Sequence, residues 1–321
     1  VLLTIAMRCF LMNSADILTL RNIFVMYCID VLIRMQESLR KFFFMNNVKM
    51  KIALIPRDPV HSPNMAANDA AILECIAGEL EKHGADVTIL KEDCTIDRNT
   101  DLVCHMTRTA STLKWLKAAE AKGSIVVNRP EAVEACSRRE FMERLKESNV
   151  PQPQFRAIAE EEDFDALTYP AWIKRAEGWS CHKNDVSFAK DASEAKEAFR
   201  KMQTRGITGC IHCCHIAGDL IKFYGVGDRY FHCGYPLANG KFGLESINGA
   251  PQHFEFSKKE LHRIATEAAK AVGIEIYGGD CIVDVMGGIH IIDINDFPSF
   301  SAVRETAAKE ITAYLIKKIE E

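Results

Sequence analysis

The chain has 321 residues, of which 48% are hydrophobic and 26% are charged, and its formal net charge is −4. This length exceeds one ordinary domain, and the composition is typical of a folded, soluble protein, which excludes a disordered chain. The small negative charge offers no basic field, so nucleic acid is not expected as a partner. The 12 cysteines lack the close spacing of a secreted disulfide scaffold, which indicates a reduced, cytoplasmic compartment.

Residues 1–49 differ from the rest of the chain, because they are rich in Leu, Ile, Met, Phe and Cys and contain no proline or glycine. Charged residues such as Arg8, Asp16 and Arg21 interrupt every apolar run before it reaches membrane-spanning length, and no small-residue cleavage site indicates a signal peptide. The segment is either a helical extension that binds a membrane surface or a partner, or a stretch outside the folded body. We favour the second, because residues 50–55 read as the start of a buried first strand.

A chain that begins at Met50 is therefore expected to fold and to melt at the same temperature as the full chain. A loss of several degrees would correspond to about 1 kcal/mol or more, and would mean that the segment packs on the body. Thermal melting of the two chains is the measurement.

From residue 50 onward, short apolar strands alternate with helices. Strands are predicted at 51–55, 86–90, 101–106 and 124–128, and helices at 69–82 and 111–122. This alternation predicts a parallel sheet with helices on both faces. Because ligands bind at the carboxyl ends of such strands, the loops that hold Arg57, His61, Asn64 and Arg108 are candidates for a substrate site.

A second region begins after a helix predicted at 131–148, where Pro151 and Pro153 mark a boundary. The pattern then becomes richer in strands. The predicted strands are 169–174, 185–189, 210–216, 219–226 and 229–235, the predicted helices are 193–205 and 257–272, and a hairpin at 275–295 precedes a final helix from about 302.

The hairpin carries the strongest chemical signal. A two-residue turn at Gly287 and Gly288 would place Asp280 opposite Asn295 and Ile282 opposite Asp293. Asp280, Asp293 and Asn295 would then share one face, with Asp284 on the same face nearer the turn. Two carboxylates and an amide oxygen suit Mg²⁺, whereas the alternative is an acidic patch at a strand end.

The residues 278–280 (Gly-Gly-Asp) and 292–299 (Ile-Asp-Ile-Asn-Asp-Phe-Pro-Ser) resemble the metal-binding end of the ATP-grasp superfamily. Segments 128–131, 136–139, 149–153, 173–178 and 216–222 are similar, in order and spacing, to other parts of that module. The resemblance implies an α/β ATP-grasp fold with a Rossmann-like pre-ATP-grasp domain (50–130), a central and lid subdomain (131–212) and a metal-binding α+β subdomain (213–321). The extension 1–49 lies outside these three.

The resemblance also implies a role for each matching residue. Asp280, Asp293 and Asn295 would bind Mg²⁺ (or Mn²⁺). Lys174 and Arg138, with Arg139 as the alternative, would contact phosphates, and Glu177, Gly178 and His182 would belong to a lid loop over them. Cys213, Cys214 and Ile216 would line the adenine, Asp219 would reach the ribose, and Lys222 would contact phosphate or substrate. Beyond the metal residues, Arg304 and Arg108 are expected to face a substrate carboxylate.

A competing interpretation concerns Cys210, His212 and Cys214, which would share one face of a strand and are common zinc ligands. Three alternating ligands on one straight strand rarely converge on a tetrahedral ion. We therefore favour buried cysteines beside the adenine pocket.

The implied function is that of a ligase that uses ATP and Mg²⁺ to activate a small carboxylate as an acyl phosphate for attack by an amine. Such an enzyme would resemble the ribosomal-protein glutamate ligases and the D-alanine–D-alanine ligases, and could form a homo-oligomer without membrane association. The alternatives are a small-molecule kinase resembling the inositol-phosphate kinases, and an ATP-binding module that has lost catalysis. The last is suggested by Arg138 in place of the usual lysine, by Cys213, and by a lid loop with a single glycine.

Overall fold

The computed structural model describes residues 49–62, 65–92, 99–236, 247 and 249–321, and the chain divides into two units, Val1–Lys49 and Met50–Glu321. The first unit lies almost wholly outside the described residues, so the expectation for residues 1–49 stays a prediction. Asn64, one of the predicted loop candidates, also lies outside them. Within the described part of the chain, no helix is both long enough and apolar enough to cross a membrane.

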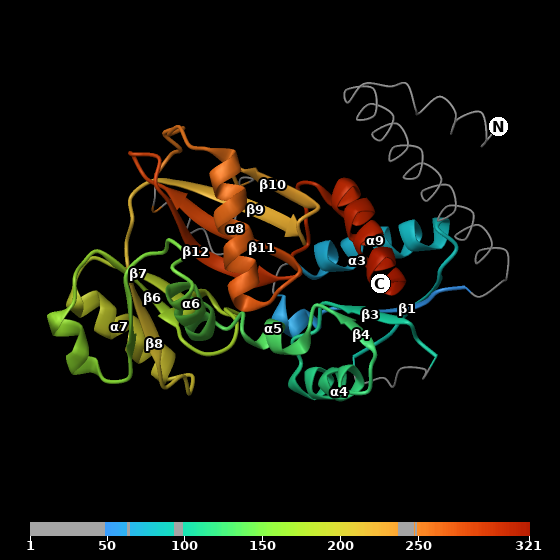
Figure 1. The fold of residues 1–321 in the computed structure, drawn as a ribbon. Coiled ribbons are helices and arrows are strands. Elements are labelled where there is room, and N and C mark those ends of the chain that lie inside the picture. Colours follow the sequence, from blue (N-terminus) through green and yellow to red (C-terminus); the bar gives the residue numbers. More distant parts are fainter. Residues whose placement is uncertain (1–48, 63–64, 93–98, 237–246, 248) are drawn as a thin grey trace, which may run out of the picture. The chain divides into compact units, whose positions relative to one another are not determined.

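The first sheet of the second unit is parallel. Its strands, in the order β2-β1-β3-β4, are Asp86–Ile89, Lys51–Ile55, Leu102–His105 and Ile125–Val127. Alternate residues of β1 face opposite ways, as a strand requires. Ile52 and Leu54 pack against α3 (Ala66–Lys82) and α9 (Arg304–Glu320), whereas Ala53 and Ile55 pack with Leu116 of α4 (Ala110–Glu120). Figure 1 shows α3 beside α9 and α4 beside β4.

A second sheet is antiparallel, in the order β5-β8-β6-β7, with strands Phe155–Ile158, Cys210–Cys214, Ala171–Arg175 and Val186–Ala189. Helix α7 (Ala192–Gln203) covers one face through Phe199 and Met202. Strand β5 was absent from the predicted elements. The predicted boundary between residues 212 and 213 lies within β8.

The helix predicted at 131–148 is wrong as a single element. The segment forms two helices, α5 (Pro130–Glu134) and α6 (Arg138–Glu147). Ser137 between them, at the N-terminal boundary of α6, has extended backbone dihedral angles, so the second helix starts in a new direction. This break brings Arg138 to the first turn of α6.

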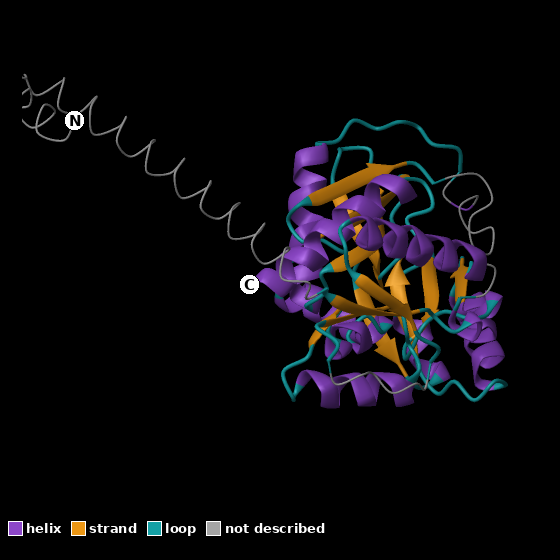
Figure 2. Ribbon diagram, turned by 90° about the vertical axis from the view of Figure 1, so that its right-hand side faces the viewer, coloured by secondary structure: helices purple, strands orange, loops and turns teal. Residues whose placement is uncertain are grey.

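The third sheet is antiparallel, in the order β10-β9-β11-β12, with strands Tyr230–Gly234, Asp219–Val226, Ile276–Val283 and Ile289–Asp296. Helix α8 (Lys258–Val272) lies across it and buries Leu261, Ile264 and Ala268 with Phe223 and Tyr277. Figure 1 shows α8 along one face of these strands, and Figure 2 shows helices and strands of the same fold from the side. The α8 helix ends at Gly273 with φ +87°, a left-handed conformation that glycine adopts without steric cost.

The β11–β12 hairpin has a different register from the predicted one. Asp280 lies opposite Asp293 rather than Asn295, and Ile282 lies opposite His290 rather than Asp293. The shift at Asp280 is two residues, and an even shift leaves side chains on the same face. Asp280, Asp293 and Asn295 therefore share one face of the sheet, as predicted.

The longer turn explains the changed register. The strands end at Val283 and resume at Ile289, and Asp284 accepts hydrogen bonds from the backbone N–H groups of Met286 (2.8 Å) and Gly288 (2.9 Å). Because its carboxylate organises the turn, Asp284 does not join the acidic face as predicted. A β-bulge next to Asp280 accounts for the remaining offset.

Candidate functional site

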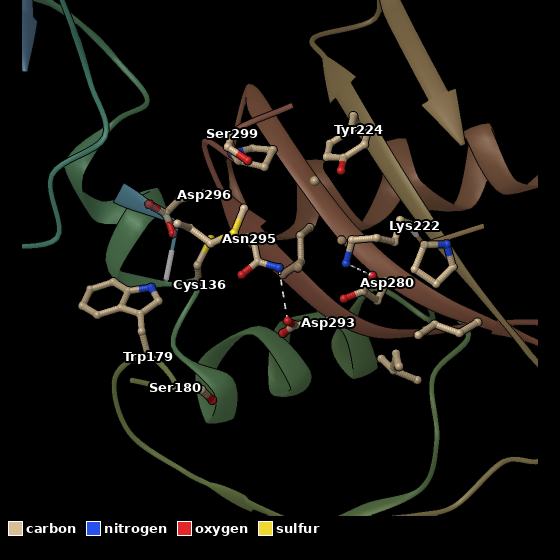
Figure 3. Close-up of a pocket in the computed structure, with 18 of the residues that line it drawn as sticks. Cys136, Trp179, Ser180, Lys222, Tyr224, Asp280, Asp293, Asn295, Asp296 and Ser299 are labelled. Carbon is tan, nitrogen blue, oxygen red and sulfur yellow. Dashed lines mark hydrogen bonds and ion pairs between the residues drawn. The ribbon is translucent and has the colours of Figure 1, made fainter. Parts of the chain in front are cut away.

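A cavity of about 790 Å³ is lined by residues of the second and third sheets, of the loops that follow β1 and β3, and of α3, α6 and the start of α9. Three parts of its wall differ in chemistry: an acidic face on β11 and β12, an apolar wall on β6 to β9, and a polar end at the loops of the first sheet. Figure 3 shows the acidic face with Lys222 and the lid-loop residues Trp179 and Ser180.

The acidic face is held by the paired strands. Asp280 and Asp293 lie directly opposite each other, and the Asn295 amide N–H donates to the Asp293 carboxylate over 3.1 Å. In this orientation the Asn295 carbonyl oxygen remains an acceptor beside two carboxylates. Gly279 permits the close pairing, since a Cβ there would lie 2.4 Å from the Asp293 carbonyl oxygen.

Each carboxylate of this face has a basic neighbour. Lys222 of β9 donates to Asp280 over 2.7 Å, and Arg138 of α6 lies 3.4 Å from Asp293. The Asp280 carboxylate raises the pKa of Lys222, so this lysine remains charged. The structure thus brings together predicted residues from four separate segments.

Lys174 is the most buried cation of the cavity wall, at 6% exposure. Its ammonium group donates to the backbone carbonyl of Ile292 over 3.3 Å and has no carboxylate partner among the described residues. Burial lowers the pKa of Lys174. A buried cation that contacts no carboxylate directly is well suited to bind an anion.

The apolar wall lies on the predicted adenine segment and beyond it. Cys213, Cys214 and Ile216 line the cavity, as expected from the resemblance. The structure adds lining residues that the sequence reasoning did not single out: Pro153, Trp172, Val186, Leu220 and Ile282. An apolar wall that includes an aromatic ring suits a planar heterocycle.

The first-sheet loops contribute a buried ionic network. Arg108 donates to Asp296 over 2.8 Å, and Arg57 lies 3.2 Å from Asp296 and 3.3 Å from Asp69. Asp296, at 1% exposure, directly follows Asn295 on β12. Arg108 lines the cavity, but its guanidinium is paired with Asp296, so the expected contact with a substrate carboxylate stays a prediction. No local pattern indicated the two pairs with Asp296, which join residues 188 and 239 positions apart.

Arg304, at the start of α9, lines the same end of the cavity. It donates to the Asn68 side chain over 2.7 Å, while its Nε–H is buried with no hydrogen-bond partner among the described residues. An unpaired buried donor is unfavourable unless something fills its position. Arg304 is thus available for an anionic group.

The lid loop enters the cavity through Gly178, Trp179 and Ser180. The Arg108 guanidinium lies over the Trp179 ring, with its central carbon 5.0 Å from the ring centroid. The Ser180 hydroxyl oxygen accepts a hydrogen bond from Arg138 over 3.5 Å. Two predicted lid residues do not line the cavity. Glu177 is exposed beside Arg139, and His182 caps the short helical turn that follows.

Asp219 is also placed elsewhere than predicted. Its carboxylate is buried and accepts hydrogen bonds from the backbone N–H groups of Gln252 (2.7 Å) and Phe254 (2.8 Å) and from the Tyr235 hydroxyl (3.1 Å). Asp219 thus organises a loop and does not line the cavity, so a ribose contact is not supported. A buried carboxylate takes the nearest backbone donors, which lie more than 30 residues away in sequence.

The zinc interpretation also finds no support. Within the described ranges, no three His, Cys, Asp or Glu side chains are grouped so as to hold a metal ion. His212 is hydrogen bonded to the Thr168 carbonyl over 2.9 Å and packs on Tyr169. The acidic face is a different donor set, with two carboxylates and one amide oxygen, which fits Mg²⁺ completed by water and phosphate oxygens.

No known protein-family profile matches the chain, and no curated protein sequence matches it. Solved structures do. A RimK-domain ATP-grasp protein from Sphaerobacter thermophilus is similar with a TM-score of 0.61 and 14% identity, over 83% of this chain and 99% of that one. The VanG D-Ala:D-Ser ligase from Enterococcus faecalis is similar with a TM-score of 0.64 and 14% identity, over 84% of this chain and 99% of that one. The D-alanine–D-alanine ligase from Bacillus anthracis, solved with ATP, has a TM-score of 0.63 and 12% identity, over 84% of this chain and 97% of that one.

These likenesses show that the chain has the ATP-grasp fold, and they confirm the fold class that the hairpin motif predicted. At 12–14% sequence identity they establish the fold alone.

Proposed function

We propose that this protein is a ligase that uses ATP and Mg²⁺ to activate a small carboxylate as an acyl phosphate, which an amine then attacks. The observation that supports this most directly is that one cavity holds both the oxygen donors of Asp280, Asp293 and Asn295 and two cations. These cations, Lys174 and Arg304, have no carboxylate partner among the described lining residues. The structurally similar proteins include a D-Ala:D-Ser ligase and a D-alanine–D-alanine ligase, which supports a ligase over other ATP-dependent activities.

In this proposal ATP lies along the cavity with its base at the apolar wall and its phosphates at the acidic face. Lys174, Arg138 and Lys222 bind phosphate oxygens as positive charges, and Gly178 of the lid loop lies over them. Cys213, Cys214 and Ile216 contact the base. No protein nucleophile is required, because phosphoryl transfer depends on positioning and charge stabilisation.

Asp280, Asp293 and Asn295 are the residues that would hold the metal. A bound Mg²⁺ supplies neutralisation of phosphate charge, and Mn²⁺ accepts the same oxygen donors. Lys222 and Arg138 pair with Asp280 and Asp293, respectively, and so help to hold these carboxylates in place.

Arg304 binds the carboxylate substrate and orients it toward the phosphates. One carboxylate oxygen attacks the terminal phosphorus, the bond to the leaving oxygen breaks, and ADP departs with that electron pair. The amine then attacks the acyl carbon and phosphate leaves. The net products are an amide, ADP and phosphate.

The kinase alternative draws no support from the charges of the cavity. A highly anionic inositol phosphate needs many cations in addition to those that bind the ATP phosphates, whereas Arg57 and Arg108 are both paired with the buried Asp296. We also propose that residues 50–130, 131–212 and 213–321 act as the substrate-binding, lid and metal-binding parts of the enzyme.

The test is to incubate the protein with Mg²⁺ and ATP, and with small carboxylates and amines singly and in pairs. A ligase releases ADP and phosphate with an amide product only when both substrates are present. Transfer of the phosphoryl group to a stable product would instead identify a kinase. No nucleotide binding at all would contradict both.

Lys174→Met is expected to weaken ATP binding by about tenfold to a hundredfold, because one charge-assisted hydrogen bond contributes about 1.5–3 kcal/mol. Calorimetric titration measures it. Because burial lowers the pKa of Lys174, wild-type affinity should also fall at alkaline pH as the amine loses its proton. Lys174→Arg is the control, since arginine stays charged and should remove this alkaline loss. Equal affinity in Lys174→Met and wild type would contradict the phosphate-binding role.

A further inference from the structure

Trp172 of β6 forms part of the apolar wall, and its indole is held from one side by a histidine. The indole N–H donates to Nδ1 of His215 over 3.1 Å. His215 directly follows β8 and is not among the residues that line the cavity. Its backbone N–H donates to the Pro170 carbonyl over 3.1 Å, so the histidine is itself anchored.

Aromatic contacts complete the arrangement. Phe188 of β7 lies opposite Trp172 in the sheet, and their rings meet edge to face with centroids 5.2 Å apart. His215 packs against the same Phe188 at 5.2 Å and against Trp172 at 6.1 Å. The three rings form a closed cluster in which only the hydrogen bond to His215 fixes the indole by a directional contact.

We propose that His215 is a positioning residue for nucleotide binding, which holds the Trp172 indole at the wall that receives the adenine base. This inference rests on the proposed function, because it requires the base to bind at the apolar wall. A wall fixed before binding loses less side-chain freedom when the base arrives, so the bound state is favoured. Removing the acceptor frees the indole to rotate and leaves its N–H without a partner.

The chemistry requires a neutral histidine. Nδ1 can accept the indole N–H only when it carries no proton. The ring faces Trp172, Phe188 and the Pro170 backbone, none of which is charged, and burial lowers the pKa of His215. The hydrogen bond therefore persists at neutral pH and is lost as the pH falls through that lowered value.

The experiment measures the affinity of the full chain for ATP with Mg²⁺ by calorimetry in two variants. His215→Phe keeps a ring but has no acceptor, and is expected to bind ATP about two- to tenfold more weakly, which is the contribution of one hydrogen bond. His215→Gln offers a carbonyl acceptor and is expected to restore affinity toward the wild-type value. His262→Phe is a matched control, because His262 stacks on Phe231 at 4.5 Å and does not line the cavity.

A Trp172→Phe background separates positioning from general damage to the fold. Without the indole N–H, the Phe and Gln substitutions at His215 should bind ATP equally. Acid pH gives a second readout: the affinity of wild type should fall relative to that of His215→Gln, while titration of ATP itself affects both proteins alike.

The outcomes distinguish this inference from the proposed function. If wild type binds no ATP, both are overturned. If wild type binds ATP but His215→Phe binds equally well, or if Phe and Gln weaken binding to the same extent, the positioning role alone is overturned.

Discussion

Asp293→Asn is expected to reduce Mg²⁺-dependent turnover by about a hundredfold or more while leaving the protein folded. The proposed metal ligand loses its charge, and stabilisation of transferring phosphate by a cation contributes several kcal/mol. The structural cost should be small, because the Asp293 side chain is 27% exposed and asparagine has nearly the same size and shape. Rates measured across a range of Mg²⁺ concentrations, together with a melting curve, are the required data.

Asp284→Asn is the matched control for this substitution. It makes the same chemical change in the same hairpin, but Asp284 organises the turn and does not line the cavity. It should leave turnover and its Mg²⁺ dependence near the wild-type values. An Asp293→Asn protein with unchanged rate and Mg²⁺ dependence would refute the metal assignment.

Asp296→Asn is expected to lower the free energy of unfolding by about 3–5 kcal/mol, because removing one partner of a buried ionic network leaves its counterparts uncompensated. Asp296 is 1% exposed and is the carboxylate shared by Arg57 and Arg108. Chemical denaturation gives the free energy, and thermal melting should fall in step.

A surface carboxylate supplies the comparison. Asp163 lies 3.8 Å from Arg156 in an exposed pair, so Asp163→Asn should change the free energy of unfolding by less than about 1 kcal/mol. If Asp296→Asn cost no more than this control, the network would not join the first-sheet loops to β12 energetically.

Asp293 and Asp296 stand in one short motif, yet sequence reasoning could separate their roles only in part. The alternation of side chains along a strand placed Asp280, Asp293 and Asn295 on one face correctly. The exact pairing was wrong because Asp284 captures backbone donors in the turn and a bulge follows Asp280. The face on which a side chain lies depends on whether the register shift is even or odd, and a shift of two residues leaves it unchanged. Which residues pair across the hairpin depends instead on the geometry of the turn.

The sequence by itself determined the elements whose signal is local. Strand β1 and the parallel first sheet followed from apolar runs and helix caps. Short segments read in order also singled out Asp280, Asp293, Asn295 and Lys174, which all line the cavity. Only the tertiary structure decided how polar groups are partnered. Arg108 and Asp219 were expected to contact ligands, but burial obliges each to take the nearest complementary group, and those groups lie far away along the chain. The hydrogen bond between Trp172 and His215 was not predicted either, because it joins β6 to the residue after β8, and no local pattern encodes the adjacency of these two strands.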